Sequence, residues 1–129
     1  MKTVFVVEDD PFILDIYTTK LRESGFSVES SSNGQDCIKK VQEVKPDLVL
    51  LDIVLPGLDG WEIIREIKKQ GEFKDLPIVI LSNLSQKQEV EKGLDLGAVK
   101  YLIKSNYTPG EVVDEIKDIL RRKMKPSNQ

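Results

Sequence analysis

Five short runs of mainly apolar residues recur along the chain, and each is too short to form a helix. The runs at 48–51 and 78–81 are apolar at every position, which is typical of strands that helices cover on both faces. The run at 26–30 alternates with serine and glutamate, which predicts a more exposed strand. The five predicted strands are 3–7, 26–30, 48–51, 78–81 and 99–103.

Apolar spacing and capping residues predict a helix after each strand. Ser85 and Gln88 form a capping-box pattern, so the fourth helix is expected to begin there and to end at about Gly93 or Gly97. The predicted caps of the first, third and fifth helices are Asp10, Asp59 and Thr108. The apolar positions at helical spacing are Ile13, Ile16, Tyr17, Leu21, Cys37, Ile38, Val41, Trp61, Ile63, Ile64, Ile67, Val112, Val113, Ile116, Ile119 and Leu120.

The repeated order of strand and helix predicts one doubly wound α/β domain. Its five-stranded sheet is expected to be parallel, with the strand order 2-1-3-4-5 that is usual for small domains of this type. We expect the domain to cover residues 1–124 and residues 125–129 to form a disordered tail.

Composition narrows the range of functions. With 129 residues, 40% of them hydrophobic, the chain has room for one domain with a sizeable core. The net charge of -3 disfavours direct nucleic-acid binding. No apolar run approaches the ~18 residues of a membrane span, and no signal peptide is evident, so we expect a cytoplasmic protein without membrane contact. One cysteine excludes an internal disulfide, and the lack of histidine excludes histidine-based acid–base catalysis.

Polar residues follow each of the predicted buried strands. They are Glu8, Asp9 and Asp10 after the first strand, Asp52 after the third, Ser82 after the fourth and Lys104 after the fifth. Parallel strands place their carboxyl ends at one edge of the sheet, so these side chains are expected to converge.

Several carboxylates at one sheet edge repel each other, which suggests that a divalent cation lies among them. Oxygen ligands alone favour Mg²⁺. Together with a lysine and a hydroxyl, such a cation could hold the oxygens of a phosphoryl group. Asp52 could then attack phosphorus directly to give an acyl phosphate, a reaction that needs no histidine base.

This set of residues resembles the site of response-regulator receiver domains of two-component signalling, over essentially the whole chain. The resemblance implies a CheY-like, flavodoxin-like (βα)5 fold. The family's acidic pair falls on Glu8 and Asp9, its phosphoacceptor on Asp52, its hydroxyl on Ser82, its lysine on Lys104 and its aromatic switch residue on Tyr101.

The resemblance also implies ligands and partners. Mg²⁺ would be held by Asp9, Asp52 and the main-chain carbonyl of Val54, with Glu8 acting through water. Asp10 would mainly cap a helix. The phosphoryl donor would be a histidine kinase or a histidine phosphotransfer protein. The chain, as a stand-alone or isolated receiver, would signal to a downstream protein through its fourth helix, fifth strand and fifth helix, and would catalyse no reaction beyond its own phosphorylation and dephosphorylation.

The chain departs from the family pattern beside the site. Ser105 stands where the family usually has a cis proline, and because a cis bond before serine would cost ~3 kcal/mol, we expect a trans bond and a rebuilt loop. Asn83 replaces a small residue and is expected to narrow access to the phosphoryl site. By resemblance, Val54 and Leu84 hold the positions that control hydrolysis, and both are apolar. Slow self-hydrolysis is therefore expected.

A further departure concerns dimerisation. Lys100 and Glu115 have signs opposite to those of the winged-helix transcription factors of this family, so their mode of dimer formation is not expected.

Other functions are less consistent with the sequence. A pseudo-receiver, which would bind a protein without being phosphorylated, is the main alternative, because the loop at Ser105 is altered. A flavin site is disfavoured because Glu8 and its acidic neighbours would repel the flavin phosphate. A phosphatase of the haloacid-dehalogenase type would need a second aspartate where Val54 stands.

Overall fold

Five parallel strands form one sheet in the order β2-β1-β3-β4-β5, which confirms the predicted doubly wound fold. The computed structural model describes residues 1–124, with side chains described up to residue 122. The tail predicted at 125–129 lies outside the described residues. The strands are β1 (Thr3–Val7), β2 (Ser27–Ser31), β3 (Leu48–Leu51), β4 (Ile78–Ser82) and β5 (Lys100–Ile103).

A helix follows each strand. These helices are α1 (Pro11–Glu23), α2 (Gly34–Val44), α3 (Gly60–Lys69), α4 (Lys87–Asp95) and α5 (Pro109–Met124), and two 3₁₀ turns are η1 (Gly71–Phe73) and η2 (Lys104–Asn106). Within residues 1–124, none of the helices combines the length and the apolar character needed to cross a bilayer.

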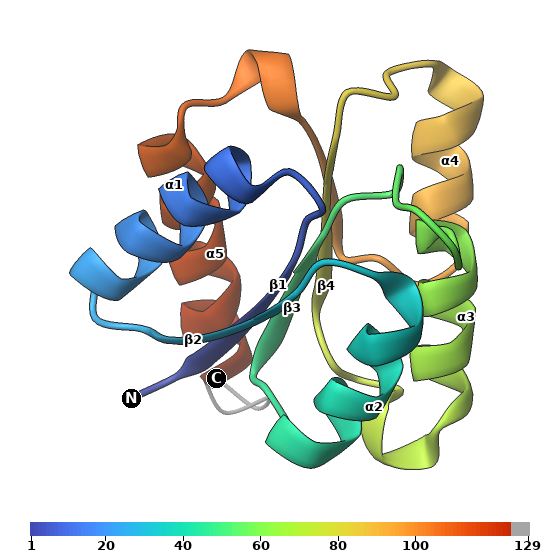
Figure 1. Ribbon diagram of the computed structural model, residues 1–129, viewed down its shortest axis with the longest axis horizontal. Coiled ribbons are helices and arrows are strands. Elements are labelled where there is room, and N and C mark those ends of the chain that lie inside the picture. Colours follow the sequence, from blue (N-terminus) through green and yellow to red (C-terminus); the bar gives the residue numbers. More distant parts are fainter. Residues whose placement is uncertain (125–129) are drawn as a thin grey trace.

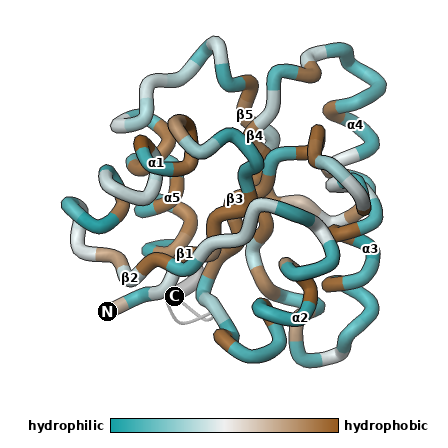
Figure 2. The backbone as a smooth tube through the Cα atoms, viewed as in Figure 1, coloured by the Kyte–Doolittle hydropathy of each residue, from teal (hydrophilic) through white to brown (hydrophobic). Residues whose placement is uncertain are grey.

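The helices cover both faces of the sheet, with α1 and α5 on one face and α2, α3 and α4 on the other (Figure 1). Successive strand residues point to opposite faces, so Val4 and Val6 of β1 pack under α1 and α5, whereas Phe5 and Val7 pack on the other side. Figure 2 shows hydrophobic segments along the central strands and hydrophilic segments on the outer turns of the helices. The central strands are therefore continuous apolar runs because both of their faces are buried.

The buried face of α1 differs from the predicted one. Ile16 is 49% exposed, whereas Tyr17, Thr18 and Leu21 are buried. Because successive helix residues are rotated by about 100°, a face centred on these three includes Leu14 and leaves Ile16 toward solvent. The prediction that Ile16 is buried was wrong because the spacing of apolar residues alone does not fix the centre of the buried face of α1.

The predicted capping box of α4 was also wrong. Gln86 is the N-cap, and its backbone N–H donates to Glu89 Oε1 at 3.0 Å. The observed pair, Gln86 and Glu89, has the same three-residue spacing as the predicted pair, Ser85 and Gln88, but begins one residue later. The side chain that accepts the N-cap N–H is therefore the carboxylate of Glu89. A carboxylate accepts an N–H more strongly than an amide oxygen does.

The other predicted caps are present. Asp10 and Asp59 accept backbone N–H groups at the starts of α1 and α3. At the start of α5, the Thr108 N–H donates to Glu111 Oε1 at 2.8 Å and the Glu111 N–H donates to Thr108 Oγ1 at 3.1 Å. One strand boundary differs: β2 begins after Phe26, because the Phe26 N–H donates to Leu21 and so closes the end of α1.

Candidate functional site

Three carboxylates and one ammonium meet at the carboxyl edge of the sheet. Lys104 Nζ, after β5, lies 2.7 Å from Glu8 Oε1 and 3.0 Å from Asp52 Oδ2. One carboxylate oxygen from each of Glu8, Asp9 and Asp52 lies within 4.8 Å of the others. The residues come from the ends of β1, β3 and β5, so the sheet topology alone brings them together.

Burial makes these charges interact strongly. Glu8 is 4% exposed and Asp52 is 8% exposed, whereas Asp9 is open to solvent. Burial raises the pKa of Glu8 above its ordinary value, because the hydrogen bonds from Lys104 and from the Asp10 N–H offset only part of that effect. Burial by itself lowers the pKa of Lys104, but the hydrogen bonds to Glu8 and Asp52 outweigh it and raise the pKa. The ammonium is therefore held in its charged form.

The raised pKa of Glu8 predicts a pH effect on stability. The folded protein binds the Glu8 proton more tightly than the unfolded chain, so ionisation of Glu8 lowers the free energy of unfolding as pH rises from the ordinary value of 4.5 through the folded pKa. We expect Glu8→Gln to gain stability relative to wild type across this window in metal-free buffer. Urea unfolding at a series of pH values measures the difference. Glu29→Gln at an exposed position is the control, and a Glu8→Gln difference that stays constant with pH would contradict the assignment.

The acidic cluster fits a divalent metal ion. Glu8, Asp9 and Asp52 offer only carboxylate oxygens, which are the ligands that Mg²⁺ and Ca²⁺ prefer. Asp52 Oδ1 also accepts the Val54 N–H at 3.1 Å, which holds the turn after β3 against the carboxylate. Val54 is 59% exposed, so the approach to Asp52 from this side passes an apolar side chain.

Asp10 belongs to the helix rather than to the acidic cluster. Its Oδ1 accepts the N–H groups of Phe12 and Ile13, at 2.9 and 3.3 Å. Its own N–H donates to Glu8 Oε2 at 3.2 Å. The carboxylate of Asp10 is thus occupied as the cap of α1, as the sequence predicted.

Ser82 lies on β4, between the strands that end at Asp52 and Lys104. It is fully buried, its Oγ accepts the Leu84 N–H at 3.2 Å, and its hydroxyl also forms a side-chain hydrogen bond with Tyr101. Tyr101 Oη donates to the Leu84 carbonyl at 2.6 Å. The peptide groups of Leu84 thus connect the predicted hydroxyl to the predicted aromatic switch residue, while Asn83 between them is exposed.

The peptide bond before Ser105 is trans, as predicted. The peptide bonds of the described residues are all trans, and Lys104–Asn106 forms the 3₁₀ turn η2. Ser105 and Asn106 are exposed. This turn leaves Lys104 in contact with both Glu8 and Asp52, so the altered loop does not remove the lysine from the site.

Two features of the site were not predicted from the sequence. The direct contact of Lys104 with Glu8 joins residues 96 positions apart. The sequence placed both residues at one edge, but their pairing depends on side-chain reach. The role of the Leu84 backbone was also missed, because a main-chain carbonyl leaves no signal in residue type.

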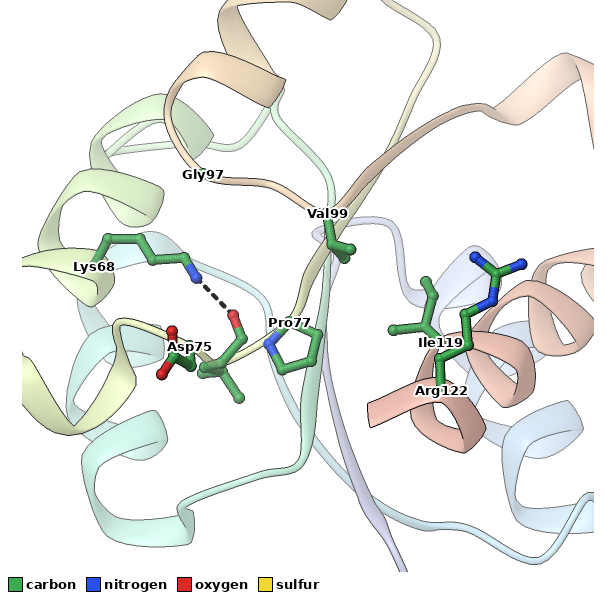
Figure 3. Close-up of a pocket in the computed structure, with 8 residues that line it drawn as sticks. Lys68, Asp75, Pro77, Gly97, Val99, Ile119 and Arg122 are labelled. Carbon is green, nitrogen blue, oxygen red and sulfur yellow. Dashed lines mark hydrogen bonds between the residues drawn. The ribbon is translucent and has the colours of Figure 1, made fainter. Parts of the chain in front are cut away.

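A separate pocket of about 460 Å³ opens at the opposite edge of the sheet (Figure 3). It lies between the amino ends of β4 and β5 and the end of α5, next to Pro77, Val99 and Ile119. Its lysine, Lys68, donates to the carbonyls of Lys74 and Leu76, at 3.0 and 2.7 Å. These bonds occupy the ammonium, so we place no anion site there.

Comparison with known proteins identifies the same family throughout. Residues 4–117 match the family described as response regulator receiver domain. The chain is 36% identical over 121 residues to the alkaline phosphatase synthesis transcriptional regulatory protein PhoP of Bacillus subtilis, covering 94% of this chain and 49% of that protein. The chain thus spans about half the length of this curated relative.

Two solved structures of similar fold have related sequences. The BeF3-activated N-terminal receiver domain of RstA from Klebsiella pneumoniae is 31% identical, with a TM-score of 0.82 over 92% of this chain and 98% of that chain. The signal receiver domain of a signal transduction histidine kinase from Syntrophus aciditrophicus is 26% identical, with a TM-score of 0.86 over 98% of this chain and 96% of that chain.

Proposed function

The chain belongs to the family of response-regulator receiver domains, and from this we propose that Asp52 accepts a phosphoryl group in a Mg²⁺-dependent reaction. The donor is a histidine kinase or a histidine phosphotransfer protein. The observation that carries the proposal is the contact of Lys104 with Asp52 beside two further carboxylates. An ionised carboxylate that is buried but reachable, next to a fixed ammonium, is suited to attack phosphorus.

The transfer is a substitution at phosphorus. An oxygen of Asp52 forms a bond to phosphorus while the bond from phosphorus to the donor's imidazole nitrogen breaks, so the nitrogen keeps the bonding electron pair. Lys104 pairs with the oxygens of the incoming group, and the Ser82 hydroxyl donates to one of them. Asp9, Asp52 and the Val54 carbonyl would hold Mg²⁺ directly and Glu8 through water. The ion would neutralise charge on the phosphoryl oxygens.

The signal leaves the site through the β4–α4 loop. When the Ser82 hydroxyl turns toward a phosphoryl oxygen, the Leu84 N–H that donates to Ser82 Oγ moves with it. The Leu84 carbonyl accepts the hydrogen bond from Tyr101 Oη, so the movement reaches Tyr101. The output surface is formed by α4, β5 and α5, where a downstream protein would bind. On this surface Lys100 forms an ion pair with Glu115 of the same molecule. This pairing supports an output other than the dimer of the winged-helix transcription factors, in which ion pairs would join two molecules.

The main alternative is a pseudo-receiver that binds a partner without phosphorylation. The sequence feature in favour of a pseudo-receiver is the altered loop at Ser105. The contact between Lys104 and Asp52 favours the phosphorylatable form instead. Intact mass after incubation with acetyl phosphate, with and without Mg²⁺, separates the two: one added phosphoryl group only with Mg²⁺ supports the proposal, and no addition in either buffer supports the pseudo-receiver.

Asp9→Ala is expected to weaken Mg²⁺ binding by at least about tenfold, because it removes one of two direct carboxylate ligands. Trp61, which is half-buried at the start of α3, provides a fluorescence signal for the titration if the wild type responds. Asp59→Asn, which keeps a capping residue outside the acidic cluster, is the matched control. Unchanged affinity in Asp9→Ala would mean that the metal binds elsewhere.

Self-hydrolysis of the acyl phosphate is expected to be slow. The attacking water must stand in line with the bond that breaks, and neither Val54 nor Leu84 can orient it by a hydrogen bond. Val54 is exposed beside the site, and Leu84 packs against the core. We expect Val54→Asn with Leu84→Glu to speed the loss of phosphoryl-Asp52 by about tenfold, or ~1.4 kcal/mol of barrier. Wild-type loss within seconds, or an unchanged rate in the double variant, would contradict this.

A further inference from the structure

The turn between β2 and α2, residues 31–34, touches the backbone segments on both of its sides. On one side, the Ser31 carbonyl accepts the Glu8 N–H at 3.2 Å. On the other side, Gly34, the first residue of α2, packs on Leu58 in the loop after β3. The turn therefore lies between the two segments that carry the acidic cluster, one after β1 and one after β3.

The contact between Gly34 and Leu58 leaves no room for a side chain. A Cβ added to Gly34 would lie 2.5 Å from the Leu58 carbonyl oxygen and 2.8 Å from Leu58 Cβ, whereas ordinary contacts begin at 3.4 Å. The backbone fixes both of these atoms, so rotation of a side chain cannot relieve the overlap. Gly34 has no positive φ, so its own backbone conformation does not call for glycine. Glycine is needed at this position for the close approach alone.

The β2–α2 side of this contact is firmly held. Ser31 is buried, and its Oγ donates to the Asn33 carbonyl at 2.9 Å. Asn33 Oδ1 accepts the Asp36 N–H at 3.0 Å and so caps α2. Further along the helix, Cys37 and Val41 are fully buried. Helix α2 therefore cannot move away from the loop after β3 without opening the core.

The loop after β3 must then take up any displacement, because most of residues 54–59 are exposed. The two ends of this loop are joined closely. The Gly60 N–H donates to the Ile53 carbonyl at 3.0 Å, and a Cβ on Gly60 would lie only 2.5 Å from Ile53 Cα. A shift at Leu58 is thus confined to residues 54–59. This stretch begins with Val54, whose N–H donates to Asp52 Oδ1 at 3.1 Å.

We propose that the turn 31–34 fixes the spacing between the two acidic segments, and that Gly34 is a positioning residue for the divalent-metal site. The effect on metal affinity rests on the proposed Mg²⁺ site. The effect on the loop after β3 can be measured in metal-free protein.

The choice of ion separates positioning from general stability. Mg²⁺ requires short bonds in near-octahedral geometry, whereas Ca²⁺ accepts longer bonds and variable geometry. A displaced segment from Val54 onward should therefore weaken Mg²⁺ binding more than Ca²⁺ binding. A loss of stability that leaves the folded site unchanged would not alter the ratio of the two affinities.

The test compares Gly34→Ala with wild type in two measurements. In metal-free protein, hydrogen exchange followed by NMR should be faster at the Val54 amide, because its bond to Asp52 Oδ1 is disturbed. The Asp52 amide, which donates to the Val7 carbonyl within the sheet, is the internal reference and should not change. By isothermal titration calorimetry, we expect the Kd of Mg²⁺ to rise about tenfold and that of Ca²⁺ by no more than about twofold.

Three further variants complete the test. Gly71→Ala is the matched control, because an added Cβ there meets nothing within 4 Å and neither measurement should change. Val41→Ala removes packing from the buried face of α2, so it should destabilise the protein and keep the ratio of Mg²⁺ to Ca²⁺ affinity. Leu58→Ala withdraws a side chain that packs against the core, and so frees the loop while Gly34 is in place. It should reproduce both effects, and it decides the test if Gly34→Ala does not fold.

Unchanged exchange at the Val54 amide in folded Gly34→Ala, or in Leu58→Ala if the former does not fold, would overturn the inference. Equal changes in Mg²⁺ and Ca²⁺ affinity, or the same change of ratio in Val41→Ala, would overturn the positioning role of Gly34 toward the metal. If the wild type binds neither ion and gains no phosphoryl group, the proposed function fails, while the exchange measurement still decides whether the turn holds the loop.

Discussion

Asp52→Ala is expected to take up no phosphoryl group from acetyl phosphate under conditions in which the wild type gains one. Asp52 directly follows the central strand β3, and its Oδ2 accepts a hydrogen bond from the Lys104 ammonium at 3.0 Å. The exposed Asp9 lacks that contact in the structure. The loss should therefore be complete, and intact mass measures it directly.

Asp10→Asn is the matched control for this loss. It changes a carboxylate one position from the acidic cluster, and asparagine caps a helix about as well as aspartate. Phosphorylation should persist in Asp10→Asn. Labelling that survives Asp52→Ala would reject Asp52 as the acceptor.

Lys104→Met is expected to destabilise the protein by roughly 3 kcal/mol in metal-free buffer, because it leaves two buried carboxylates without their shared cation. The side chains of Lys104, Glu8 and Asp52 are 13%, 5% and 9% exposed, so water screens the pairs little. Urea unfolding measures the loss. Mg²⁺ should restore part of the stability if it binds among the same carboxylates.

The control for Lys104→Met is Lys100→Met, which breaks the pair with Glu115. Those side chains are 41% and 28% exposed, and a pair of this exposure contributes about 0–1 kcal/mol. A Lys104→Met cost no larger than that of Lys100→Met would show that the ammonium does not hold the acidic cluster together.

The fold could be predicted from sequence because its main signal is local. Runs such as Leu48–Leu51 are apolar at every position only when both faces of a strand are covered, and parallel topology then brings Asp52 and Lys104 to one edge. The exact ends of the helices and strands depended on competition between neighbouring residues for the same capping position. Gln86 displaced Ser85 as the cap of α4 because Glu89 supplied the better acceptor.

The contacts within the site could not be predicted because they depend on side-chain reach and backbone position. The sequence placed Glu8 near a metal ion, whereas the structure also pairs it with Lys104. Nothing in residue type shows that Tyr101 donates to the carbonyl of Leu84.

The most direct test of the proposed phosphorylation of Asp52 is to locate the phosphoryl group on the chain. An acyl phosphate on aspartate is reduced by borohydride to homoserine, and the change is found by fragmenting the peptides of a protease digest. After incubation with acetyl phosphate and Mg²⁺, we expect homoserine at position 52 and at no other aspartate, with unmodified peptides when Mg²⁺ is omitted. Homoserine at Asp9 or at another position, or equal modification without Mg²⁺, would contradict it.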